Sequence, residues 1–178
     1  KGADLVLFSG DKLLGGPQSG IIVGKAEIIE LLEKHPMYRA LRVDKMNLAA
    51  LSATLLYYMK GEAATKLPVW HMILESETNL KQRAKKWARA IGARASVIQG
   101  SSTIGGGSLP EETLPSWLVA IDCGKQSAKC LELVEKLRIG KPPIIARIDA
   151  NMVLFDPRTV LQQEDSVFLQ RVTEATRD

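Results

Sequence analysis

The sequence predicts a mixed α/β fold. Short apolar runs bounded by glycine, proline or charged residues, such as Leu5–Phe8 and Trp117–Asp122, have the length and composition of strands. Between them lie longer segments in which apolar residues recur every three or four positions, as in a helix packed on one face. With 178 residues, 46% hydrophobic and 25% charged, the chain has the composition of an ordinary globular protein of one domain or slightly more.

Two strands are expected at residues 4–9 and 20–24, and they frame a glycine-rich loop that holds Lys12 beside Asp11. Glycine permits left-handed backbone angles and the close approach of another group. A lysine held in such a loop can form an imine with an aldehyde when desolvation leaves it partly neutral. The alternative is a solvated turn with a surface lysine.

A short amphipathic helix is expected at residues 25–34, ended by His35–Pro36 because the residue before proline avoids helical angles. If the next segment is locally helical, Arg39 and Arg42 lie three positions apart on one face. Two guanidinium groups facing one way suit a tetrahedral oxyanion. The alternative is two solvated arginines paired with nearby acids, namely Glu30, Glu33 or Asp44.

The segment 47–59 is rich in alanine and leucine and is apolar on most sides, which predicts a buried helix. Its expected core residues are Leu48, Leu51, Leu55 and Met59. Lys60–Gly61 is the expected stop.

After the apolar run 67–74, a helix is expected up to Ile91, capped by Ser76 and ended by Gly92. Its predicted buried stripe is Leu80, Ala84, Trp87 and Ile91. It also carries the most basic patch of the sequence, formed by Lys81, Arg83, Lys85, Lys86 and Arg89. This patch fits either a nucleic-acid phosphate backbone or an ordinary solvated face, and no aromatic residue interleaves its charges for base stacking.

The remaining segments predict a small α/β domain. Strands are expected at 94–99 and 117–122, joined by the glycine-rich loop 103–110, which lacks the spacing of a nucleotide-binding loop. A helix at 127–137, a hairpin turning at 149–151 and a last helix at 164–176 follow, with Val167, Phe168 and Val172 expected inward. Arg147 is expected to be a structural arginine at a strand edge.

Cys123 and Cys130 are interpreted as free cytosolic thiols, since the chain has no C-x-x-C pair and no paired His/Cys spacing. The same lack of paired spacing leads us to expect no metal site. The apolar stretches fall well short of a membrane span, and we expect a cytoplasmic location. The net charge of +4 is compatible with a polyanionic partner without requiring one.

The segments Ser9-Gly-Asp-Lys-Leu-Leu-Gly-Gly-Pro-Gln18 and Gly20-Ile-Ile-Val-Gly-Lys25 resemble the lysine segment of the bacterial selenocysteine synthase (L-seryl-tRNA(Sec) selenium transferase) family. The resemblance continues through residues 35–45, 48–55 and 104–110. It implies the C-terminal part of a fold type I (aspartate-aminotransferase-like) enzyme that uses pyridoxal 5'-phosphate. Residues 1–62 would be the end of the large domain with its linking helix, and residues 63–178 a small C-terminal α/β domain.

The resemblance also implies residue roles. Lys12 would hold pyridoxal phosphate and act as general base, with Asp11 tuning it or relaying protons. Arg39 and Arg42 would neutralise selenophosphate. The remaining expected cofactor-binding residues are Ser9, Gly16 and Gln18, and the segment 16–18 would reach the cofactor phosphate of a neighbouring copy in a ring of dimers. The substrate would be serine-charged tRNA(Sec).

The chain opens Lys1-Gly-Ala-Asp, and Lys12 follows almost at once, whereas fold type I enzymes carry this lysine late in a large domain. We therefore expect a C-terminal piece of a longer enzyme, inactive by itself. Two alternatives stay open: a pyridoxal-phosphate-dependent ammonia-lyase of a phosphorylated amino sugar, and a non-catalytic oligomerisation or RNA-contact module.

Overall fold

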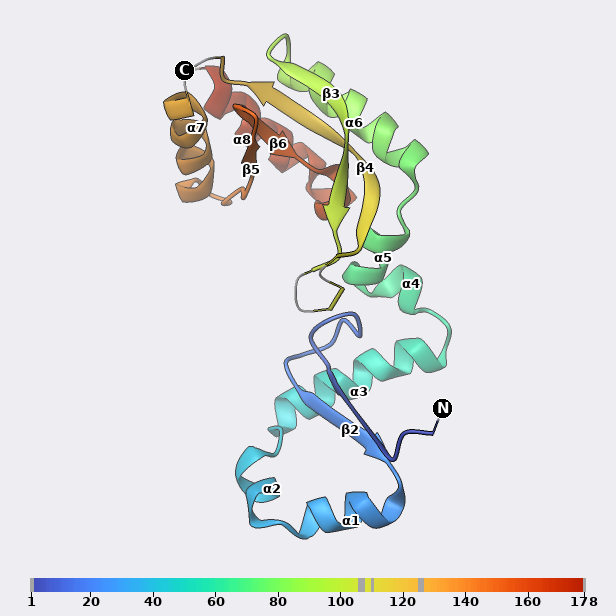
Figure 1. Cartoon of the computed structure of the whole chain (residues 1–178). Coiled ribbons are helices and arrows are strands. Elements are labelled where there is room, and N and C mark those ends of the chain that lie inside the picture. Colours follow the sequence, from blue (N-terminus) through green and yellow to red (C-terminus); the bar gives the residue numbers. More distant parts are fainter. Residues whose placement is uncertain (1, 106–107, 110, 125–126, 178) are drawn as a thin grey trace. The chain divides into compact units, whose positions relative to one another are not determined.

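The chain forms two compact units, Lys1–His71 and Met72–Asp178, in a computed structural model that describes residues 2–105, 108–109, 111–124 and 127–177 (Figure 1). Both units combine helices with antiparallel strands, so the predicted α/β class is confirmed. Each unit is defined by the contacts within it, which does not test where a domain ends. The domain boundary near residue 62 stays a prediction.

The first unit begins with an antiparallel hairpin of β1 (Leu5–Ser9) and β2 (Gly20–Gly24), in which Leu5 faces Gly24 and Ser9 faces Gly20. These are the two strands that the sequence predicts. Five helices follow: α1 (Ala26–Lys34), α2 (Pro36–Leu41), α3 (Lys45–Met59), α4 (Ala63–Lys66) and α5 (Pro68–Leu74).

Local sequence explains where these helices begin and end. His35 has extended angles, ends α1 and accepts a hydrogen bond at Nδ1 from the Met37 amide, which starts α2. Asp44 caps α3 by accepting hydrogen bonds from the amides of Asn47 and Met46, at 3.0 and 2.8 Å. These backbone hydrogen bonds, that of Asn47 foremost, lower the pKa of Asp44.

Helix α3 is helical as predicted but is not buried. Leu48 and Met59 are 55% and 82% exposed, Leu55 is also exposed, and Thr54 is the buried residue of this helix. The apolar residues surround the helix instead of forming one stripe, and the rest of the first unit covers only part of its circumference. The predicted core role of this helix is therefore wrong within this chain.

The second unit is built on a four-stranded antiparallel sheet in the order β3-β4-β6-β5. The strands are β3 (Ala95–Thr103), β4 (Thr113–Asp122), β5 (Arg147–Asp149) and β6 (Met152–Phe155). Positive φ at Ala150 and Asn151 forms the predicted tight turn between β5 and β6. In the predicted glycine-rich loop, Gly106, Gly107 and Pro110 lie outside the described residues.

Helices α6 (Glu77–Ile91), α7 (Ser127–Ile139) and α8 (Asp165–Arg177) contribute the side chains that cover one face of this sheet. Two 3-10 turns, η1 (Pro157–Thr159) and η2 (Gln162–Glu164), precede α8. Trp87 is completely buried, its ring centroid 4.1 Å from that of Phe168. The predicted stripe of α6 is confirmed for Leu80, Ala84 and Trp87, and Ile91 packs partly buried at its end.

Two predictions for this unit are wrong. Val167 is 43% exposed, because its neighbour Phe168 takes the inward position and Val172 and Ala175 continue that face. Cys123 and Cys130 are paired in a disulfide with their Cα atoms 5.6 Å apart. The end of β4 and the first turns of α7 bring the two cysteines together, a proximity that residue spacing alone did not reveal.

Candidate active site

The Lys12 loop, residues 10–19 between β1 and β2, is closed by its own backbone. The amide of Gly10 donates to the Ser19 carbonyl and the amide of Gly16 donates to the Gly10 carbonyl, both at 2.8 Å. The Gly15 amide donates to the Lys12 carbonyl at 2.9 Å, which makes a tight turn directly after the lysine. Gly15 has φ +74°, an angle that favours glycine.

Two aromatic residues from later helices brace this loop. The Tyr58 hydroxyl of α3 donates to the Leu14 carbonyl at 2.9 Å and accepts from Trp70 Nε1 of α5 at 2.6 Å. Sequence reasoning missed both residues. The available signal was weak: a tyrosine and a tryptophan, each able to hydrogen-bond at its polar end, stand in largely apolar segments.

The loop also packs tightly against the same two helices. A Cβ added at Gly15 would lie 2.8 Å from Val69 Cγ1, and one added at Gly16 would lie 3.3 Å from Thr54 Oγ1. Both glycines are therefore needed for close approach, and Gly15 also for its backbone angle. The peptide that follows Lys12 is held in one place.

Lys12 and Asp11 lie side by side at the start of the loop, just after β1. Lys12 Nζ is 3.5 Å from Asp11 Oδ2, and their side chains are 48% and 29% exposed. The Ser9 hydroxyl donates to Asp11 Oδ1 and is the main reason that the pKa of Asp11 lies below its ordinary value. The site therefore presents an accessible primary amine beside an ionised carboxylate.

The other expected loop residues are arranged differently from one another. Ser9 faces Asp11, as described. The Gly16 amide already donates to the Gly10 carbonyl, so it is not a free N–H donor. Gly16 instead lets the loop pack closely against Thr54. Gln18 is exposed and hydrogen-bonds to none of the described residues.

Arg39 and Arg42 do not share a helical face. Helix α2 ends at Leu41, and Arg42 beyond it has extended angles of φ −61° and ψ 142°. Both arginines are exposed, and within the described residues neither forms an ion pair or a hydrogen bond, with the Lys12 loop or with an acid. Asp44, one of the acids considered as a partner, is occupied in capping α3. Two unpaired guanidinium groups thus remain available to an anion.

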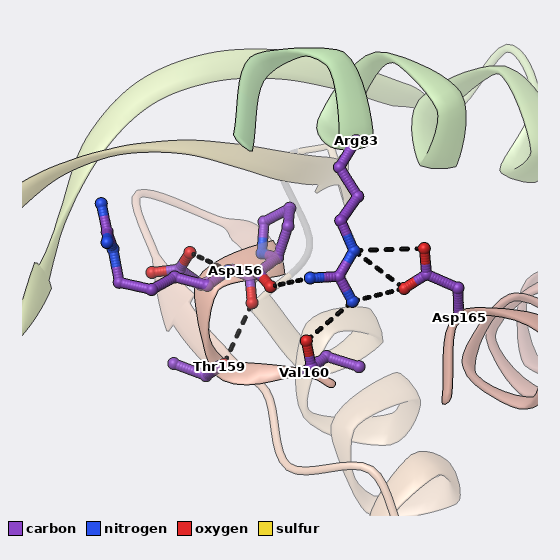
Figure 2. Close-up of polar contacts among 7 residues, drawn as sticks. Arg83, Asp156, Thr159, Val160 and Asp165 are labelled. Carbon is purple, nitrogen blue, oxygen red and sulfur yellow. Dashed lines mark hydrogen bonds and ion pairs between the residues drawn. The ribbon is translucent and has the colours of Figure 1, made fainter. Parts of the chain in front are cut away.

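The basic patch of α6 is smaller than the sequence suggests. Arg83 turns away from solvent to pair with Asp165 and donates to the carbonyls of Pro157 and Val160 at 2.6 and 2.7 Å (Figure 2). Lys81 Nζ lies 3.9 Å from the ring centroid of Trp117.

Arg147 donates to the Ser101 carbonyl at 3.1 Å from the edge strand β5, which agrees with the structural role expected of it. No group of three or more His, Cys, Asp or Glu side chains in the described ranges could hold a metal ion. In the same ranges, no helix is both long and apolar enough to cross a membrane.

Residues 1–161 match the family SelA, L-seryl-tRNA selenium transferase. The chain belongs to this family. It is 42% identical over 176 residues to the L-seryl-tRNA(Sec) selenium transferase of Clostridium botulinum strain 657, covering 96% of this chain and 38% of that protein. The Aquifex aeolicus protein of the same name is 45% identical over 167 residues, covering 92% of this chain and 36% of that protein.

The chain thus spans little more than a third of the length of these SelA relatives. A solved structure titled D-glucosaminate-6-phosphate ammonia-lyase matches 99% of this chain and 45% of its own, with a TM-score of 0.61 and 22% identity. At that identity the likeness concerns the fold alone. The C-terminal part of a fold type I enzyme, predicted from the resemblance, is confirmed as the fold class.

Proposed function

We propose that the whole protein containing this SelA chain converts serine-charged tRNA(Sec) to selenocysteinyl-tRNA(Sec) in the cytoplasm, with selenophosphate as selenium donor and pyridoxal 5'-phosphate as cofactor. The chain supplies the lysine. The observation that carries the proposal is Lys12, an accessible amine beside an ionised carboxylate on a loop braced by Tyr58 and Trp70.

The residues present fit this cofactor. An aldehyde requires a reachable primary amine, and the Lys12 side chain is half exposed on a loop closed by backbone hydrogen bonds. When bound, pyridoxal phosphate supplies an electron sink for the negative charge that develops at the substrate α-carbon. Ser9 holds Asp11, and Gly15 and Gly16 let the loop pack closely on α3 and α5.

Lys12 has two roles in this proposal. Its amine would hold the cofactor, and its Nζ, when free, would remove the proton from the serine α-carbon as general base. Asp11, kept ionised by the Ser9 hydroxyl, lies near enough to stabilise the protonated amine or to pass the proton on.

Arg39 and Arg42 bind the anionic selenium donor. Guanidinium groups donate parallel hydrogen bonds to tetrahedral oxyanions, and these two are exposed and free of acidic partners among the described residues. The segment 16–18, with the exposed Gln18, reaches the cofactor phosphate of a neighbouring copy in a ring-shaped assembly of dimers. These assignments rest on the family resemblance together with the exposure of the residues.

The first experiment uses the full-length protein. Pyridoxal phosphate is added, borohydride reduction fixes it to the protein, and peptide mass locates the modified lysine. Label on Lys12 is expected, and Lys12→Ala should abolish it. Lys25→Ala is the matched control, because Lys25 directly follows β2 of the same hairpin but pairs with Asp4. Label on another lysine would contradict the mechanism. The absence of any label would favour the alternative of a non-catalytic module.

The second candidate is a pyridoxal-phosphate-dependent ammonia-lyase of a phosphorylated amino sugar, and the solved structure that shares this fold carries the name D-glucosaminate-6-phosphate ammonia-lyase. It would keep Lys12 and an anion-binding arginine but would not bind tRNA. Arg39→Ala and Arg42→Ala separate the two candidates. In a selenium transferase they raise KM for selenophosphate and leave tRNA affinity unchanged, whereas in a lyase they raise KM for the sugar phosphate.

A further inference from the structure

From residue 82 onward, the solvent-facing side of α6 carries positive charge without a compensating negative one. Its exposed residues, here called the α6 basic face, are Gln82, Lys85, Lys86, Arg89 and Ala90, and they line a shallow hollow. Three of the five are cations. Glu77 in the first turn is the acid of this helix, and residues 78–91 contain no other.

These three cations differ from the other basic residues of the helix. Lys81 and Arg83 are engaged by Trp117 and Asp165. By contrast, Lys85, Lys86 and Arg89 form no ion pair or hydrogen bond with any described residue. They repel one another, because Lys85 and Arg89 are four positions apart and Lys86 and Arg89 three, spacings at which like charges destabilise a helix.

Helix α7 of the same unit is the useful contrast. Its basic residues, Lys129, Lys136 and Arg138, are interspersed with Glu132 and Glu135, the pattern of an ordinary solvated surface. The α6 basic face lacks that compensation. A face that carries only repelling cations is stabilised when a polyanion binds to it.

We propose that the α6 basic face binds the phosphate backbone of RNA, and on the function proposed above this RNA is the tRNA substrate. Long exposed side chains spread along one helix suit an extended polyanion better than a single small anion, which needs a built pocket. We expect this face to contact phosphates and not bases. Bases stack on aromatic rings, and the nearby ring of Trp117 is covered by Lys81. This inference rests on the proposed function.

The test measures affinity of the full-length protein for uncharged tRNA(Sec) by fluorescence anisotropy over a series of salt concentrations. The variant carries Lys85→Gln, Lys86→Gln and Arg89→Gln. The matched control carries Lys129→Gln, Arg138→Gln and Lys141→Gln, the same change in net charge elsewhere in the unit. Thermal unfolding of both checks that the fold is kept, as expected for exposed positions.

For the α6 variant we expect affinity to fall at least about tenfold at 0.1 M salt, and the slope of log K against log salt to become shallower by about 2 to 3. The affinity of the variant for an unrelated RNA of equal length should fall in parallel, because phosphates carry no sequence information. The control should change affinity less than about twofold, since its cations are not at the contact.

The outcomes distinguish the two proposals. If the parent protein binds tRNA and the α6 variant keeps the parent's salt slope, the RNA contact is overturned while the proposed function stands, and an acidic protein becomes the candidate occupant of this face. If the parent protein does not bind tRNA at all, the proposed function and this contact fail together.

Discussion

The two units of this SelA chain differ in how they bury their apolar residues. In the second unit a continuous core joins one face of the sheet to α6, α7 and α8, with Trp87, Val119 and Val172 fully buried. In the described part of the first unit, the one buried apolar side chain is Leu67. Phe8, Leu41, Met46 and Met59 are among the many apolar residues that it exposes.

This difference shows that the Lys12 loop is not held in place by a hydrophobic core. The loop is fixed by backbone hydrogen bonds and by the Tyr58–Trp70 pair, while many apolar side chains of the first unit are exposed. Large exposed apolar surfaces mark sites of protein association. We therefore expect the first unit to depend on contacts outside this chain and the second to stand alone.

Separating the two units should have the largest effect on folding. Residues 72–178 expressed alone should unfold cooperatively on heating, because their core is complete within the unit. Residues 1–71 alone should show no cooperative transition, since they bury too little apolar surface to offset chain entropy. Circular dichroism measures both, and a cooperative transition in 1–71 would contradict the comparison.

Within the intact chain, Trp87→Ala should lower the free energy of unfolding of the second unit by about 3–5 kcal/mol, the usual cost of emptying a buried aromatic site. Leu48→Ala in α3 is the control and should change stability by less than about 0.5 kcal/mol, because Leu48 is exposed. Urea denaturation followed by fluorescence compares them. Equal effects would show that the two units are packed alike.

Arg83→Lys tests the polar support of the second unit. Lysine keeps the charge near Asp165 but cannot also reach the carbonyls of Pro157 and Val160, so we expect a loss of about 1–3 kcal/mol (Figure 2). Arg89→Lys, on the exposed face of the same helix, should be nearly neutral. The measurement is again urea denaturation, and a neutral Arg83→Lys would mean that its carbonyl contacts contribute nothing.

Tyr58→Phe tests the brace of the Lys12 loop. It leaves the Leu14 carbonyl and the Trp70 N–H without this partner, a cost of about 1–2 kcal/mol. Amide exchange at Gly15 and Gly16, the donors that close the loop, should accelerate about tenfold if the loop opens alone. Tyr57→Phe is the matched control. Unchanged exchange would show that the backbone closes the loop unaided.

The smallest effect concerns Asp11. Its pKa lies below the ordinary 3.8, chiefly because the Ser9 hydroxyl donates to it, so Ser9→Ala should raise that pKa. The carboxylate contributes stability above its unfolded pKa, and that contribution is lost as the pH falls through the lower folded value. Carbon NMR of the Asp11 carboxyl follows the titration, with Ser52→Ala as control. An unshifted titration in Ser9→Ala would exclude the hydroxyl as the cause.

The elements of the fold were largely predictable, because they depend on local sequence. Strand-length apolar runs, the Pro36 break, and the Ser76 cap with Gly92 at the end of α6 all occur as expected. Periodicity also identified the face of α6 that packs on the sheet. Exposure of α3 was not predictable, since apolar composition does not say whether a covering partner belongs to the same chain.

The site was predictable only in part. Lys12 and Asp11 stand out in a rare motif, and their proximity follows from adjacency in sequence. The brace by Tyr58 and Trp70 joins residues more than forty positions from the loop, and no local pattern encodes such a contact. The ion pair of Arg83 with Asp165 was missed for the same reason. The Cys123–Cys130 pair, seven positions apart, was missed because its proximity depends on how the chain turns from β4 into α7.

The brace has a consequence for the order of events during synthesis. A chain leaves the ribosome from its N-terminus, so Lys12 emerges well before Tyr58 and Trp70. The hairpin of β1 and β2 can form early, because its contacts are local. The turn after Lys12 acquires its side-chain support only once α5 has been made. The loop that carries Lys12 thus gains its side-chain support late, after the rest of the first unit has been translated.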